Sequence, residues 1–142
     1  MGQFTRVAAD LNTVAAFLAA PDLAEGTPSA VADEIGESHA DLLVLLGNSV
    51  LHTVTSVAAG MKRGVADRLL IAGGNGHSTE HLRAAVRAFW PYKDIAVDDR
   101  AEAEILRDLL VHAHGVDEES ILTETESTNC GANAENAHRL LT

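Results

Sequence analysis

The chain has little cysteine and few aromatic residues. Its single cysteine, Cys130, excludes an internal disulfide and favours a reducing compartment. One tryptophan, one tyrosine and three phenylalanines leave aliphatic side chains to fill the core. The longest apolar run, 14–20, ends at Pro21, far short of the roughly 20 residues that span a bilayer. The N-terminus lacks a basic region and a small-residue cleavage site. We therefore expect a soluble, cytoplasmic protein.

Positive charge is also scarce. Ten Lys and Arg residues face 21 Asp and Glu residues, which gives a formal net charge of −11. This balance disfavours nonspecific binding to nucleic acid or to an anionic membrane surface, and it mildly disfavours a large polyanionic ligand. The length of 142 residues predicts one domain, near the lower limit for a doubly wound α/β protein. The expected partner is a small molecule.

Apolar periodicity alternates between helix-like and strand-like segments along the chain. We expect strands at 41–46, 68–72 and 120–123, and the pattern leaves room for another at 94–97. We expect helices at 6–20, 50–64, 79–90 and 100–114, one from about 132, and a helical turn at 31–35. The continuous apolar run 42–46 predicts a strand buried on both faces of a parallel sheet. Alternating strands and helices predict an α/β fold, with 1–40 as an N-terminal helix and connector and 41–142 as the main domain.

The most informative stretch follows the second expected strand. Leu69 to Ala72 is apolar, and Gly73-Gly74-Asn75-Gly76-His77-Ser78-Thr79 leads into the next helix. Glycines let the backbone approach a ligand closely, and a helix N-terminus favours an acceptor or anionic group. An ordinary strand-to-helix turn also favours glycine, and this alternative stays open.

Polar clusters follow three of the expected strands. They are Gly47-Asn48-Ser49, the stretch from Gly73 to Thr79, and the stretch from Glu124 to Gly131. Ligands of open α/β sheets bind beyond the carboxyl ends of the strands. The three loops therefore predict one crevice that binds a ligand.

The glycine-rich loop does not match the common nucleotide motifs. His77 follows Gly76 where a Walker loop has lysine, which makes hydrolysis of ATP or GTP improbable. The dinucleotide fingerprint is approached by Gly74, Gly76 and Thr79, but its third glycine is missing. Glu124 and Glu102 are candidate acceptors for ribose hydroxyls. A helix N-terminal charge or a solvated surface group explains either carboxylate equally well.

Other side chains permit further chemistry. Cys130, before a helix, and His77 are a conceivable nucleophile pair, although a packing role for the cysteine is commoner. His77 and His81 lack a third metal ligand at a recognisable spacing, so no metal site is predicted. Asn129, Asn133 and Asn136 suit helix caps or a hydrogen-bonding pocket.

With these residues in view, the chain resembles the YdcF-like family, a domain-of-unknown-function group that also includes the SanA and ElyC envelope proteins. The resemblance extends over nearly the whole chain, and its Gly-His-Ser-Thr and Ser-Thr-Asn-Cys-Gly forms are closest to the YdcF branch. It differs at Ala132, where an acidic residue is frequent. The matching pieces are Leu45–Asn48, Gly73–Thr79, Arg100–Ala103, Glu124, Ser127–Gly131 and Asn133–Ala134.

The resemblance implies a Rossmann-like three-layer α/β fold with a mainly parallel sheet, and binding of S-adenosylmethionine with no established reaction. It also implies a further strand and helical region after residue 142, so that self-association or a missing C-terminal region is expected. The implied pocket residues are Gly47, Asn48, Gly73, Gly74, Gly76, His77, Ser78, Thr79, Glu102, Glu124, Ser127, Thr128, Asn129 and Asn133.

Whether the protein is an enzyme stays open at this point. One alternative is a hydrolase acting on a phosphorylated or glycan-linked small molecule, with His77 and Glu102 as acid and base candidates. Another is a regulatory protein without catalysis, whose ligand shifts stability or partner binding.

Overall fold

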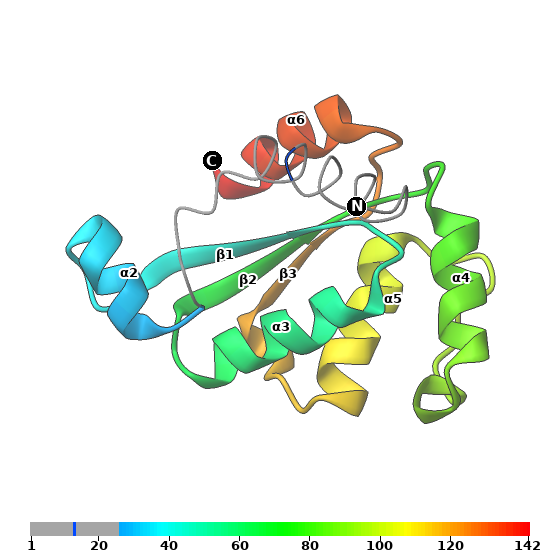
Figure 1. Cartoon of the computed structure of the whole chain (residues 1–142). Helices are drawn as coiled ribbons and strands as arrows, with labels where there is room; N and C mark the ends of the chain where they lie inside the picture. The colour runs from blue at the N-terminus through cyan, green and yellow to red at the C-terminus, as the bar shows by residue number, and fades with distance from the viewer. Residues whose placement is uncertain (1–12, 14–25) are drawn as a thin grey trace.

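The computed structural model describes residue 13 and residues 26–142 (Figure 1). The helix expected over 6–20 lies outside the described residues, Thr13 excepted. None of the helices in the described part is long and apolar enough to cross a membrane.

The centre of the fold is a three-stranded parallel sheet. Its strands are β1 (Ala40–Leu46), β2 (Ala66–Ala72) and β3 (Ile121–Glu124), in the order β1-β2-β3. The register pairs Leu46 with Ala72 and Ala72 with Glu124. All three strands therefore end in one row, and the polar loops that follow them meet at one edge of the sheet.

Helices cover both faces of this sheet (Figure 1). α3 (Leu51–Lys62) and α5 (Glu102–Asp108) pack on one face, and α6 (Cys130–Leu141) packs on the other against β2 and β3. α4 (Thr79–Ala88) lies beside α3. This arrangement confirms the predicted α/β fold, with the Rossmann-like layout of helices on either side of a parallel sheet.

Shorter elements connect the main ones. Thr27 caps α2 (Pro28–Ile35), which contains the helical turn expected at 31–35. Gly64 and Gly115 follow helical segments with φ of 76° and 65°, as expected of glycines that stop helices. The remaining short elements are η1 (Trp90–Tyr92), η2 (Leu109–Ala113) and η3 (Glu118–Ser120).

The main apolar core lies between the sheet and the face covered by α3 and α5. Leu69 and Ile71 of β2 contribute fully buried side chains from the centre of the sheet. Val54, Leu106 and Leu110 meet them from the helical layer. This packing anchors the strand ends that carry the site.

Three sequence predictions need correction. Residues 94–97 form turns and irregular backbone instead of a strand, and Val97, 4% exposed, fills the core. The helix expected over 100–114 changes after Asp108 into a π-helical turn. β1 is not buried on both faces, because Val44 and Leu46 are 47% and 53% exposed. α6 covers β2 and β3 and leaves that face of β1 open among the described elements.

Candidate functional site

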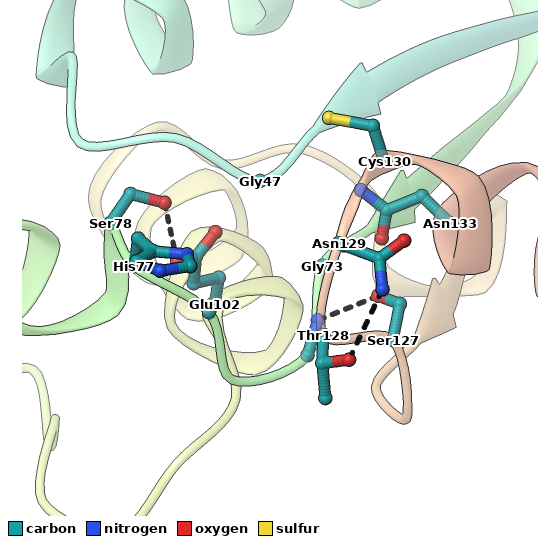
Figure 2. Close-up of a pocket in the computed structure, with 12 residues that line it drawn as sticks. Gly47, Gly73, His77, Ser78, Glu102, Ser127, Thr128, Asn129, Cys130 and Asn133 are labelled. Atoms are coloured by element: carbon teal, nitrogen blue, oxygen red, sulfur yellow. Dashed lines mark hydrogen bonds between the residues drawn. The ribbon is translucent and has the colours of Figure 1, made fainter.

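A cavity of about 280 Å³ lies at the carboxyl ends of the strands, where the three polar loops meet (Figure 2). Its walls come from the end of β1, the loop between β2 and α4, the start of α5, and the segment that leads into α6. The lining residues are Gly47, Gly73, Gly74, Gly76, His77, Ser78, Glu102, Ser127, Thr128, Asn129, Cys130 and Asn133. The crevice predicted from the three loops is therefore present.

The glycines around the cavity allow close packing of the protein's own backbone. A Cβ on Gly73 would lie 2.8 Å from the Gly47 Cα atom, and a Cβ on Gly47 would collide with Glu102 Oε2. A Cβ on Gly74 would lie 2.7 Å from the Thr125 carbonyl oxygen and closer still to that of Ser127. None of these glycines has a positive φ. An ordinary turn favours glycine because glycine adopts a positive φ easily, so a turn alone does not explain these three glycines.

Gly76 differs from the other glycines of the loop. A Cβ there would lie 3.4 Å from the Thr128 carbonyl oxygen, an ordinary contact distance. Protein packing therefore does not require glycine at this position. The absent side chain instead leaves open space at the cavity wall.

Glu102 provides the most firmly held polar group of the site. The residue is 4% exposed, and its Oε1 atom accepts hydrogen bonds from Ser78 Oγ at 2.7 Å and from Thr79 Oγ1 at 2.8 Å. Thr79 Oγ1 in turn accepts a hydrogen bond from the Gly76 amide at 2.8 Å. The carboxylate thus connects α5 to the start of α4, while Oε2 lies on the side of Gly47.

The backbone of α5 also holds the glycine-rich loop. The amides of Glu102 and Ala103 donate hydrogen bonds to the carbonyl oxygens of Gly74 and Gly73, at 3.0 and 2.7 Å. The first amides of this helix are therefore already used inside the protein. The helix positions the Glu102 carboxylate and does not itself present an anion site.

The opposite wall is formed by the start of α6 (Figure 2). Ser127 Oγ accepts a hydrogen bond from the Gly74 amide at 3.0 Å, which fixes this wall against the glycine-rich loop. Asn129 caps α6, because its Oδ1 atom accepts a hydrogen bond from the Ala132 amide at 3.0 Å. Asn133 Oδ1 is buried and has no hydrogen-bond partner. This oxygen therefore has hydrogen-bond acceptor capacity that the protein does not use within the described residues.

The charge of the lining is one-sided. Among the described residues that surround the cavity, Glu102 is the sole carboxylate, and there is no lysine or arginine. His77 lies with Ser78 and Glu102 on one wall (Figure 2). The cavity therefore suits a ligand that donates hydrogen bonds or carries positive charge, and it offers no fixed cation to a phosphate.

Three residues expected at the site do not line this cavity. Asn48 uses its side chain locally, with hydrogen bonds to the Leu46 carbonyl oxygen and from the Val50 amide, both at 2.8 Å. Thr79, 3% exposed, lies behind Glu102. The side chain of Glu124 turns to a neighbouring cavity. The sequence had placed Asn48 and Glu124 at the ends of strands and Thr79 at the start of a helix, but residue spacing does not determine which way a side chain turns.

Cys130 lines the cavity, although it was not among the residues expected there. α6 begins at Cys130, earlier than the expected start near residue 132, and this brings the thiol to the wall. The cap at Asn129 was the sequence signal for this start. Cys130 and His77 lie on opposite walls in Figure 2, and no hydrogen bond joins them in the described structure, so the nucleophile pair gains no support.

Within residues 26–142, no group of three or more His, Cys, Asp or Glu side chains can hold a metal ion. No protein-family model matches the chain. The argument for function therefore rests on the cavity and its chemistry.

Proposed function

We propose that this protein binds S-adenosylmethionine in the cavity between the glycine-rich loop and the start of α6. The observation that carries the proposal is the buried Glu102 carboxylate in a lining without lysine or arginine. A sulfonium ligand carries positive charge and has no phosphates. Its ribose hydroxyls are donors that a carboxylate oxygen accepts well.

Further features of the cavity support an adenosyl ligand. The unpartnered Asn133 Oδ1 atom can accept a hydrogen bond from an amino group of the ligand. The volume of about 280 Å³ is near the lower end of small-molecule pockets, roughly 300 Å³, so part of the ligand would extend into solvent. The resemblance to the YdcF branch points to the same ligand class.

The first test is a thermal-shift and calorimetric titration with S-adenosylmethionine, S-adenosylhomocysteine, ATP and NAD. At about 100 times its dissociation constant, a ligand stabilises the folded state by roughly 2.7 kcal/mol. We expect stabilisation by the two adenosyl-sulfur ligands and none by ATP or NAD. Stabilisation by ATP or NAD alone would overturn the proposal, as would the absence of any shift in a folded chain.

Substitution at Glu102 tests the role of its charge. Glu102→Gln keeps an acceptor for Ser78 and Thr79 but removes the negative charge. We expect it to weaken the binding of S-adenosylmethionine more than that of S-adenosylhomocysteine, which lacks the sulfonium charge, by at least tenfold, about 1.4 kcal/mol. Glu135→Gln, at an exposed position on α6, is the matched control. Equal effects of the two substitutions would contradict the proposed role.

A second candidate function is hydrolysis of a phosphorylated or glycan-linked small molecule. It is favoured by the position of His77 and Glu102 on one wall of the same cavity (Figure 2). Under this alternative, His77→Ala abolishes turnover of a substrate such as p-nitrophenyl phosphate, whereas His81→Ala, at an exposed position on α4, does not. If the cavity only binds S-adenosylmethionine, His77→Ala changes affinity modestly, and the wild-type protein shows no turnover.

A further inference from the structure

A second cavity, of about 290 Å³, lies between the end of β3 and α6. Glu124, Glu126, Asn136, Arg139 and Leu140 contribute to its lining. None of these residues lines the cavity proposed to bind S-adenosylmethionine. The second cavity therefore has its own chemistry.

Glu124 places a buried carboxylate at this cavity. The residue is 4% exposed, and its Oε1 atom accepts hydrogen bonds from the amides of Glu126 and Ser127 and from Asn136 Nδ2, at 2.7, 2.9 and 2.9 Å. Its Oε2 atom is buried and has no hydrogen-bond partner. Leaving a buried carboxylate oxygen without a hydrogen-bond donor costs stability. The oxygen is thus a natural partner for a ligand donor.

The carboxylate at Glu124 is charged at neutral pH. Burial raises the pKa of this carboxyl, but hydrogen bonds from Ser127, Asn136 and the Glu126 amide lower it more, so the net pKa lies below its ordinary value. The free oxygen therefore carries negative charge. A cationic donor fits it better than a neutral one.

Arg139 supplies the opposite charge on the same wall. Its Nη2 atom donates a hydrogen bond to Asn136 Oδ1 at 2.8 Å, and Asn136 Nδ2 donates to Glu124 Oε1 at 2.9 Å. No ion pair joins Arg139 to a carboxylate in the part of the chain that the structure describes. One amide thus holds a carboxylate and a guanidinium apart, each with hydrogen-bonding capacity left over.

We propose that this second cavity binds a free α-amino acid. The ammonium group would donate to Glu124 Oε2, and the carboxylate would accept from the Arg139 guanidinium. A zwitterion whose ammonium and carboxylate groups are joined through one carbon carries the two charges that the Glu124 carboxylate and the Arg139 guanidinium can pair with. Leu140, 51% exposed, offers apolar surface to the ligand's side chain, which favours an apolar amino acid.

Calorimetric titration with L-leucine tests the proposal, with isopentylamine and 4-methylvalerate as ligands that carry one charge each. We expect leucine to bind at least tenfold more tightly than either, because each of those ligands satisfies only one of the two side chains. No leucine binding up to about 10 mM, or equal binding of the amine or the acid alone, would overturn the proposal.

Variants assign the binding to this cavity. Arg139→Gln, at an exposed position, should weaken leucine binding at least tenfold and leave the protein folded, whereas the exposed Arg68→Gln should not change it. Glu124→Gln should also weaken binding, because an amide NH₂ would face the ligand's ammonium. Leucine binding that both Arg139→Gln and Glu124→Gln leave unchanged would refute the assignment. S-adenosylmethionine binding to the Arg139 variant is expected to be unaltered, so the two proposals fail separately.

Discussion

Gly74 faces backbone atoms wherever a side chain would project. Because the carbonyl oxygens of Thr125 and Ser127 cannot move away without disturbing the start of α6, Gly74→Ala is expected to destabilise the protein by about 3 kcal/mol. Gly26→Ala is the control, since a Cβ there meets nothing within 4 Å. Urea denaturation measures both. Equal urea midpoints for the two variants would show that the loop accommodates the added methyl group, which would contradict the prediction.

The sequence predicted the location of the candidate site better than it predicted which side chains line it. The glycine, serine and threonine residues beyond the strands could be predicted to converge, because parallel strands end at the same edge. The orientation of the Asn48 side chain could not be predicted. An asparagine side chain can bind nearby backbone groups, as Asn48 does, and residue spacing does not show whether it will. Glu124 lines the second cavity instead, because backbone amides and the Asn136 side chain donate hydrogen bonds to its carboxylate there.

Among the elements, α6 depends most on its cap. The Asn129 side chain accepts a hydrogen bond from the Ala132 amide, and no residue of this helix is fully buried. Asn129→Ala is therefore expected to cost about 1 kcal/mol of stability, with most of that recovered in Asn129→Ser. Circular dichroism during thermal unfolding measures the change. A serine variant as weak as the alanine variant would contradict a capping role.

The strands and main helices could be predicted because their apolar periodicity is regular. Two departures had causes that local sequence does not show. Val97 is buried by packing into the core without pairing in the sheet, so its apolar segment resembled a strand. The apolar pattern of β1 resembled a strand buried on both faces, but exposure depends on where α6 lies, a property of the whole fold.

For the whole molecule, we expect stability to fall in acid. Burial raises the pKa of Asp108, but hydrogen bonds and charge from Arg100, and then Arg107, lower it more, and the net pKa of Glu124 is lowered too. A carboxyl whose pKa is lower in the folded state stabilises the fold above its unfolded pKa of about 4. That stability is lost as the pH falls through the folded value.

Denaturant titrations between pH 7 and about pH 3 check this expectation. Asp108→Asn should reduce stability at pH 7 and flatten the loss in acid, because the charged partner of Arg100 is gone. Asp94→Asn, at an exposed turn position, should leave the profile unchanged. A profile for Asp108→Asn as steep as that of the wild type would assign the acid sensitivity to other groups.

The face of β1 that the described elements leave open predicts self-association of the chain. Val44 and Leu46 are 47% and 53% exposed on a strand at the edge of the described sheet. The double variant Val44→Thr, Leu46→Thr should reduce association in sedimentation velocity, while Trp90→Ser, at the exposed first residue of η1, should not. A wild-type chain that sediments as a monomer at all concentrations would count against this surface.

Because α6 forms one wall of the cavity, ligand binding is expected to change how often this helix opens. With no fully buried residue, this helix is held by its cap, by the hydrogen bond between Ser127 and Gly74, by the hydrogen bond from Asn136 to Glu124, and by half-buried contacts with β2 and β3. Such an element opens locally more often than the core does, and its amides exchange with solvent correspondingly faster. A ligand that bridges Glu102 and Asn133 would fasten the helix to the rest of the fold. Slower hydrogen exchange along 134–141 would then report occupancy of the cavity from residues of α6 that do not line it.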